Sequence, residues 1–316
     1  MNRPVVGILE PDAFSAKARA ALESAGFEVR TFSSAHPLAA FLHEVDALFI
    51  RLGRFIDGDL LRLAPRLRWL ISPTTGVTHI DTDAASARGV TVLTLAGNTH
   101  LIEHITSTPE HALGLTLALL RNYGRAFVTA ENLHWDRDSV RGHMLAGQCV
   151  GLIGHGRVGR RLAQTFSALG CRVSLHDPTQ ITDGPDARRL PDADAVIASS
   201  DIVILAASYA PGDPVILDAA RLDALAGKFL VNIARGELID EAALIERLER
   251  DLFAGVALDV IQNENAPANN LPRLAALTQN RNLLLTPHVG GATWQAMALT
   301  EEIMADMFVA AWQAAT

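Results

Sequence analysis

The sequence predicts a parallel α/β protein built from two units. Short apolar runs alternate with amphipathic helical patterns along the chain, and a glycine-rich turn joins one such run to a helix at residues 154–159. A polar stretch at residues 134–138 precedes a second alternating block. With 316 residues, 49% of them apolar, the chain is long enough for one large or two medium domains with cores of their own.

The first block covers roughly the first hundred residues. Its expected elements are strands at residues 5–9, 28–32, 47–50, 69–71 and 90–93, and a helix at residues 13–25 ended by Gly26. A long helix then starts near Thr108, which can act as its N-cap, and ends near Asn122. Pro109 suits the first turn, and Glu110 favours the positive end of the helix dipole.

The second block begins at Cys149 and is more regular. Its expected elements are strands at residues 150–153, 172–176, 195–197, 202–205, 229–232, 255–258 and 283–285, and a helix at residues 157–169 stopped by Gly170. The last helix, at about residues 293–315, has no strand of its own to pack behind. Packing of this helix on the first block is therefore an alternative, and it would make the first block discontinuous in sequence.

Composition narrows the classes of function. The formal net charge of −8 argues against nucleic-acid binding, which needs a basic face. Cys149 and Cys171 lack metal-site spacing, so we expect two buried thiols in a reducing compartment and no metal. The amino terminus has no apolar signal region, and the apolar stretch near residues 113–120 is too short to span a bilayer. We expect a soluble, cytoplasmic protein with no membrane partner.

The turn at residues 154–159 has the spacing of a dinucleotide-binding turn, and it lies between an apolar strand and a helix. Gly154 permits the tight turn, Gly156 lets a pyrophosphate approach the backbone, and Gly159 lets helix and strand pack closely. The amides of Arg157 and Val158 lie at the helix N-terminus, where an anion is favoured. A structural turn without a nucleotide is the alternative.

Asp177 lies eighteen positions after Gly159, just past the second strand of this block. Its carboxylate can accept hydrogen bonds from the adenine ribose hydroxyls and would repel a 2′-phosphate, so NAD is predicted rather than NADP. Arg172 and Arg188 would weaken that prediction, but neither follows the second strand directly.

Three later segments carry polar residues where apolar strands end, which is where open α/β sheets bind ligands. Arg235, Glu264 and His288 lie in these segments. A 2-hydroxy acid needs its carboxylate held, its hydroxyl proton removed and its hydride directed at the cofactor, and these three side chains suit that chemistry. Taken singly, each could be an ordinary surface or structural residue. The other histidines, among them His111, are expected to be structural.

The order of these motifs resembles the D-2-hydroxyacid dehydrogenase family. The matching motifs are the glycine turn, the acidic residue, Asn-x-Ala-Arg-Gly at residues 232–236, Asp-Val-x-x-x-Glu at residues 259–264 and Pro-His-x-Gly-Gly at residues 287–291. Residues 74–81 resemble the family's substrate-carboxylate loop. The family includes phosphoglycerate dehydrogenases, glyoxylate and hydroxypyruvate reductases, and D-lactate dehydrogenases.

The resemblance implies two doubly wound parallel-sheet domains with the active site between them, usually in a homodimer. One is a discontinuous flavodoxin-like substrate domain at residues 1–97 and 292–316, and the other a Rossmann NAD-binding domain at residues 98–291.

The resemblance also implies roles for single residues. Arg235 would bind the substrate carboxylate and carbonyl oxygen, and His288 would be the acid/base, with Glu264 keeping it protonated for reduction. The substrate-binding set is Gly76, Val77 and Arg235. The cofactor-binding set is Gly154, Gly156, Arg157, Val158, Gly159, Asp177, Ile233, Ala234, Arg235, Asp259 and His288.

Some features depart from the family pattern. Residues 206–211 lack the His and Pro often found there, and Asn265 follows Glu264 where Pro is typical. Residues 96–108 form a longer segment than usual, and no regulatory domain is expected after the last helix.

We expect an enzyme that interconverts a small 2-keto acid and a D-2-hydroxy acid. The alternatives are a relative of formate or phosphite dehydrogenase, and an NAD(H)-binding sensor of the corepressor type. Arg51 or Arg54 could meet a second anionic group of the substrate, but we expect each to be a surface residue and include neither among the predicted site residues.

Overall fold

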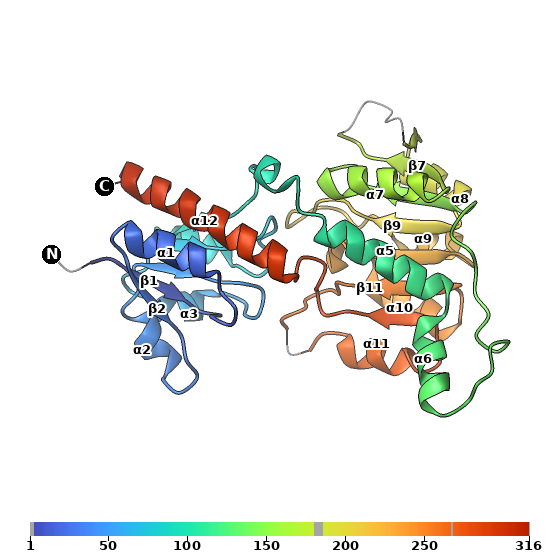
Figure 1. Cartoon of the computed structure of the whole chain (residues 1–316), viewed down its shortest axis with the longest axis horizontal. Coiled ribbons are helices and arrows are strands. Elements are labelled where there is room, and N and C mark those ends of the chain that lie inside the picture. Colours follow the sequence, from blue (N-terminus) through green and yellow to red (C-terminus); the bar gives the residue numbers. More distant parts are fainter. Residues whose placement is uncertain (1–2, 180–185, 267, 316) are drawn as a thin grey trace. The chain divides into compact units, whose positions relative to one another are not determined.

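The computed structural model describes residues 3–179, 186–266 and 268–315, which form two compact units. The first unit comprises Met1–Ile105 and Ala292–Thr316, and the second comprises Thr106–Gly291. Each unit has one parallel sheet with helices packed on it, so the predicted α/β class is confirmed (Figure 1). In the described part of the chain, every helix is too short or too polar to cross a membrane.

The sheet of the first unit has the flavodoxin-like strand order β2-β1-β3-β4-β5. Its strands are β1 Val5–Ile8, β2 Glu28–Thr31, β3 Ala47–Phe49, β4 Trp69–Ile71 and β5 Thr91–Leu93. Its helices before the last are α1 Ala16–Ser24, α2 Leu38–Leu42, α3 Gly58–Arg62 and α4 Thr82–Ala87, followed by the 3-10 turn η1 Thr99–Ile102. Because all five strands are parallel, the loops after β1, β3 and β4 lie at one edge of the sheet.

The C-terminal helix α12, Trp294–Ala315, packs in the first unit beside α1 (Figure 1). Phe308 is fully buried, and its ring contacts the rings of Phe27, Phe49 and Trp69. Helix α12 therefore belongs to the same core as the five strands from the first hundred residues, and the first unit is discontinuous in sequence.

The sheet of the second unit has the order β12-β11-β10-β9-β6-β7-β8, which contains the doubly wound Rossmann arrangement. Its strands are β6 Cys149–Ile153, β7 Arg172–His176, β8 Arg188–Arg189, β9 Ile202–Leu205, β10 Phe229–Asn232, β11 Gly255–Leu258 and β12 Leu283–Leu285. Its helices are α5 Ser107–Leu120, α6 Tyr123–Glu131, α7 Arg157–Ala168, α8 Ala193–Ser199, α9 Ala219–Ala224, α10 Glu241–Glu249 and α11 Leu271–Leu277, with the 3-10 turn η2 Gly236–Leu238.

The strand predicted at residues 195–197 is wrong, because these residues belong to helix α8. The side chain of Asp192 caps this helix by accepting a hydrogen bond from the amide of Ala195 at 2.7 Å. Val196 and Ile197 are buried on one face of the helix. Three apolar residues in a row fit a buried helix face as well as a strand, and the N-cap decides between the two.

The predicted start of the long helix α5 is also shifted. The helix begins at Ser107 with Thr106 as its N-cap, so Thr108 lies inside the first turn. The short helices α2, α3, α4, α6, α9, α10 and α11 and strand β8 were not predicted individually.

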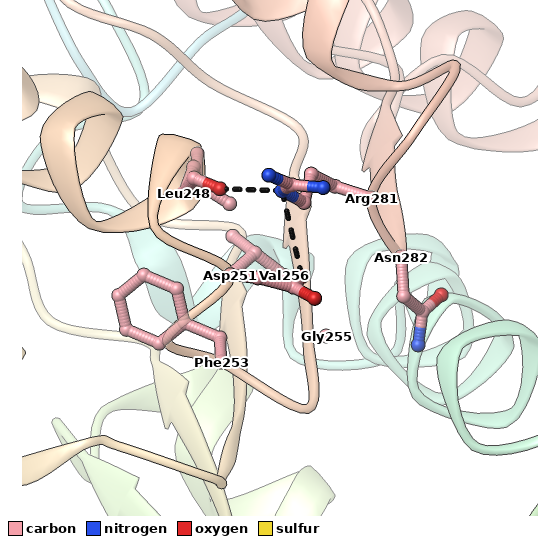
Figure 2. A pocket seen from close by; sticks show the side chains of 7 residues that line it. All are labelled: Leu248, Asp251, Phe253, Gly255, Val256, Arg281 and Asn282. Carbon is pink, nitrogen blue, oxygen red and sulfur yellow. Dashed lines mark hydrogen bonds and ion pairs between the residues drawn. The ribbon is translucent and has the colours of Figure 1, made fainter.

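Arg281 lies just before β12, at the amino-terminal end of the strands in the second unit (Figure 2). Its Nε and Nη2 atoms donate to the carbonyls of Leu248 and Glu249, each at 2.8 Å, at the end of α10. Asp251 pairs with the same guanidinium at 3.5 Å. These bonds satisfy carbonyls that a helix end leaves without partners. The predicted functional residues lie instead at the opposite edge, where the strands end.

Candidate active site

The turn after β6 requires glycine at two of its three glycine positions. Gly154 has φ +102°, and a Cβ added there would lie 2.4 Å from the amide nitrogen of Ala207. A Cβ on Gly159 would lie 2.2 Å from the carbonyl oxygen of Gly154. At Gly156 no atom of the described residues lies within 4 Å of an added Cβ, so the backbone in front of α7 is open to a ligand. This geometry fits a pyrophosphate at the helix N-terminus.

Asp177 follows β7 and lies beside that turn. One carboxylate oxygen accepts a hydrogen bond from the amide of His155 at 2.7 Å, and the other accepts two from the amide and hydroxyl of Thr179. Burial lowers the pKa of His155, Arg160 lowers it further, and Asp177 partly offsets both. The turn and the acidic residue predicted for the ribose are therefore directly connected.

His288 and Glu264 form a hydrogen-bonded pair beyond the ends of β12 and β11. The Nδ1 atom of His288 lies 2.8 Å from Oε2 of Glu264. Both side chains are partly buried, with 18% and 29% of their surface exposed. Because a carboxylate can only accept a hydrogen bond, Nδ1 carries the hydrogen shared with Glu264, and Nε2 is the ring nitrogen that can exchange a proton with a reactant.

The backbone of His288 is held in the left-handed region by Asp259. His288 has φ +53°, a conformation that costs a residue with a side chain about 1 kcal/mol or more. Its amide donates to the carbonyl oxygen of Asp259 at 2.8 Å. The carboxylate of Asp259 accepts from the amides of Val289 and Gly290 at 2.8 and 2.9 Å. One residue at the end of β11 therefore fixes the loop that carries His288.

Asp259 is only 2% exposed, yet its carboxyl stays charged. Burial raises the pKa of the Asp259 carboxyl, but hydrogen bonds from His111, Thr286, Val289 and Gly290 outweigh burial and hold the pKa below its usual value. The hydroxyl of Thr286 donates to Oδ1 at 2.6 Å, and Nε2 of His111 lies 3.1 Å from the same oxygen.

His111 and Thr286 were not predicted as members of this cluster. His111 lies on α5, 148 positions before Asp259 in sequence, so no local pattern joins the two. The one signal available was that α5 opens with a polar turn at the start of the second unit.

Arg235 lies just beyond β10 in a loop organised by Asn232. The buried Asn232 side chain donates to the carbonyl of Arg235 at 2.9 Å and accepts from the amide of Ala234 at 3.0 Å. Burial lowers the pKa of the Arg235 guanidinium, and the carboxylates of Glu264 and Glu237 partly offset that effect. Arg235 is thus a partly buried cation that lies close enough to the carboxylate of Glu264, the partner of His288, to interact with it electrostatically.

The loops after β10 and β11 are tied to each other. The side-chain amide of Gln262 donates to the carbonyl of Ile239 at 2.7 Å, and the backbone amide of Gln262 donates to the Glu241 carboxylate at 2.7 Å. The amide of Asn263 donates to Glu237 at 3.3 Å. The positions of Arg235 and Glu264 therefore depend on one another.

The predicted carboxylate loop of the first unit follows β4. The hydroxyl of Thr74 donates to the carbonyl of Gly76 at 2.7 Å, and Ser72 links Thr74 to the buried His79 with two contacts of 2.9 Å. The amide of Ile80 bonds the carbonyl of Val77. These bonds shape the backbone of Gly76 and Val77 at the carboxyl end of β4.

The second unit matches a known protein family. The family description "D-isomer specific 2-hydroxyacid dehydrogenase, NAD binding domain" matches residues 113–290, more than half of the chain. The chain belongs to the D-isomer specific 2-hydroxyacid dehydrogenase family. The matched residues contain the glycine turn, Asp177, Arg235, Asp259, Glu264 and His288.

Relatives within the family carry different names. The D-3-phosphoglycerate dehydrogenase of Mycobacterium tuberculosis is 32% identical over 82% of this chain and 48% of its own length. The chain thus spans about half the length of that relative. The glyoxylate reductase of Pyrococcus furiosus is 31% identical over 84% of this chain and 79% of its own length.

Solved structures share the fold over nearly the whole chain. A protein of Thermus thermophilus is 28% identical, with a TM-score of 0.80 over 98% of this chain and 97% of that one. The D-lactate dehydrogenase of Aquifex aeolicus, solved with NAD and lactic acid, is 23% identical, with a TM-score of 0.80 over 98% of this chain and 96% of its own. At that identity the likeness concerns the fold alone.

Proposed function

We propose that this protein is an NAD-dependent oxidoreductase that interconverts a small 2-keto acid and a D-2-hydroxy acid. The observation that carries the proposal is the His288–Glu264 pair, held 2.8 Å apart in the unit that also contains the dinucleotide turn and the desolvated Arg235. A dehydrogenase of this type needs an acid/base, a cation for the substrate carboxylate and a nicotinamide site, and one residue set supplies all three.

The open backbone at Gly156 supports NAD as the cofactor, with the amides of Arg157 and Val158 as donors to its pyrophosphate. Asp177 would bind the adenine ribose and disfavour a 2′-phosphate. Ile233, Ala234 and Asp259, in the loops after β10 and β11, would line the nicotinamide pocket. Bound NAD supplies the hydride acceptor in oxidation, and NADH the hydride donor in reduction.

Arg235 would bind the carboxylate and the carbonyl oxygen of the substrate. Because burial removes water from its guanidinium, an incoming carboxylate gains more from the charge-assisted bond than it would at an exposed arginine. The backbone amides of Gly76 and Val77 are the further donors that we assign to the carboxylate. We assign the substrate role to residues 1–97 and 292–316 and the cofactor role to residues 98–291.

His288 would move the proton. In oxidation its Nε2 atom accepts the hydroxyl proton of the substrate, and in reduction the same nitrogen returns a proton to the carbonyl oxygen. Glu264 fixes the ring through Nδ1. It also stabilises the positive charge that the ring carries while Nε2 holds the proton. Asp259 keeps the His288 backbone in place.

We also propose a homodimer in the cytoplasm, without nucleic-acid or membrane partners. No residue of α6 is buried, and the apolar side chains on it and after it are exposed: Phe127 60%, Val128 53%, Leu133 93%, Trp135 96% and Met144 80%. Exposed apolar side chains in one continuous segment are typical of a protein interface. A second copy of the chain would cover them.

The experiment that tests the function is an absorbance assay of NADH oxidation. The panel contains glyoxylate, hydroxypyruvate, pyruvate, oxaloacetate and phosphohydroxypyruvate, each with NADH and with NADPH. We expect turnover with at least one keto acid and preference for NADH. Binding of NADH without turnover of any keto acid would favour the sensor alternative.

A further inference from the structure

A buried ion pair lies at the edge of the first unit where β1, β3 and β4 end. Arg51, two residues after β3, pairs with Glu301 of α12, and its Nε atom lies 2.9 Å from Oε1 of that carboxylate. Glu301 is only 1% exposed, so an unpaired charge at this position would be costly. The pair is therefore a fixed feature of the edge.

All three nitrogens of the Arg51 guanidinium are bonded to the protein. Nε and Nη2 both contact Glu301, and Nη1 donates to the carbonyl of Asp12 at 2.7 Å. Glu301 is held in turn by the amide of Ser15, which donates to its second oxygen at 2.7 Å. Release of Arg51 toward a ligand would break all of these bonds and leave the buried Glu301 carboxylate unpaired.

This pair borders the predicted substrate loop. Arg51, Glu10 and Glu301 lie around one shallow depression together with Pro73, the residue before Thr74. Arg54, the other cation considered, lies over the ring of Phe32 at 5.8 Å, next to the end of β2. Strand β2 is separated from β4 by β1 and β3, a distance of about 14 Å at the usual strand spacing. Arg51 is thus the arginine of these two that lies beside the loop.

The edge carries more negative than positive charge. Glu301 pairs with the guanidinium of Arg51, and the carboxylate of Glu10 accepts a hydrogen bond from the backbone amide of the same residue, so two carboxylates lie around one cationic residue. A second anionic group on a substrate would meet like charges here, while the guanidinium of Arg51 is already paired.

We propose that the Arg51–Glu301 pair, with Glu10, is a specificity determinant that selects 2-keto acids without a second anionic group. The proposal rests on the proposed function and names its substrate class as monocarboxylates with an uncharged side chain. A phosphorylated acid, of the kind named in D-3-phosphoglycerate dehydrogenase, lies outside that class.

The test compares hydroxypyruvate with phosphohydroxypyruvate, which differ only in the phosphate. With NADH, we expect wild-type protein to show kcat/KM for hydroxypyruvate about tenfold or more above that for phosphohydroxypyruvate. Glu301→Gln removes one negative charge but keeps an oxygen for the Ser15 amide, and we expect the ratio to fall about fivefold. Glu302→Gln is the matched control, since Glu302 is the next residue on α12 and bonds the Ser15 hydroxyl at 2.8 Å. Its ratio should stay within about twofold of wild type.

Each result decides the matter. If wild-type protein prefers phosphohydroxypyruvate, the proposal is overturned and the proposed function stands. A Glu301→Gln variant that is folded, as judged by its thermal melt, and keeps the wild-type ratio would also overturn it. Absence of turnover with every keto acid would overturn the proposed function and this inference together. If Glu301→Gln does not fold, the wild-type ratio alone decides.

Discussion

Glu264 accepts the hydrogen bond from Nδ1 of His288 across 2.8 Å, although the two residues lie 24 positions apart on loops after different strands. The bond selects one tautomer of the imidazole and leaves Nε2 for proton transfer. Asp259 adds the second constraint by holding the His288 amide. Ring and backbone are thus fixed by separate residues of the β11 loop.

Replacement of His288 should abolish turnover while sparing cofactor binding. For His288→Ala we expect kcat in the reductive direction to fall by about 10²–10⁴-fold, because the proton donor is lost. NADH affinity, measured by fluorescence titration, should change little. Glu264→Gln keeps the imidazole and should reduce kcat less than His288→Ala does, by about tenfold. Near-normal turnover of His288→Ala would remove the residue from the acid/base role.

A methyl group on Gly156 should block the cofactor without harming the fold. An added Cβ meets no atom of the described residues within 4 Å, so Gly156→Ala should melt close to wild type. We expect NADH to bind about tenfold or more weakly, since the methyl group would occupy the space proposed for the pyrophosphate. Gly114→Ala is the control: it is also unobstructed, lies on α5, and should leave NADH binding unchanged. Equal affinity in both variants would place the pyrophosphate elsewhere.

Asp259→Asn should destabilise the protein in a pH-dependent way. An amide group would confront N–H donors in a buried cluster, so we expect a loss of roughly 2–4 kcal/mol in the free energy of unfolding at pH 7. The pKa of Asp259 is lowered in the folded protein, where burial, which raises it, is outweighed by the four hydrogen bonds.

The sign of the pH dependence follows from that lowered pKa. At pH values between the pKa of Asp259 in the folded protein and its pKa in the unfolded chain, the unfolded chain binds more protons at this position. The stability due to Asp259 is therefore complete above the unfolded pKa of about 4, and it is lost as the pH falls through the folded pKa. Urea denaturation should therefore show a constant gap between wild type and variant above about pH 5, narrowing below about pH 4. A gap that widens on acidification would contradict the charged state of Asp259.

The exposed apolar residues after α5 should mediate self-association. Trp135 is 96% exposed and Phe127 60% exposed. We expect Phe127→Glu combined with Trp135→Glu to convert a dimer into a monomer, as measured by light scattering during gel filtration. Trp294→Glu, at a residue 78% exposed in the other unit, is the matched control and should leave the dimer intact. A wild-type monomer would contradict the proposed homodimer.

The sequence predicted most of the strands because each is a short apolar run followed by a polar segment. It failed at residues 195–197, where a helix capped by Asp192 buries the same kind of run. Glu264 and His288 could be predicted as partners because both lie in motifs that resemble those of the family, whereas their position at strand ends indicated only that their loops are neighbours.

Other contacts could not be predicted, because they join residues far apart in sequence. His111 lies 148 positions from Asp259, and Arg51 lies 250 positions from Glu301. A local pattern identifies a charged residue, but whether another part of the chain neutralises that charge is known only when the fold brings the two together. The sequence alone therefore could not show that Arg51 has a partner, and the structure places its guanidinium on Glu301.

Hydride transfer from NADH with His288 as proton donor is tested most directly by the configuration and labelling of the product. The protein is incubated with pyruvate and with NADH that carries deuterium at both hydrogen positions of the nicotinamide C4, and the lactate is analysed by chiral chromatography with mass detection. We expect D-lactate that carries deuterium at C2, formed by wild-type protein and not by His288→Ala. L-lactate, or D-lactate without deuterium at C2, would contradict it.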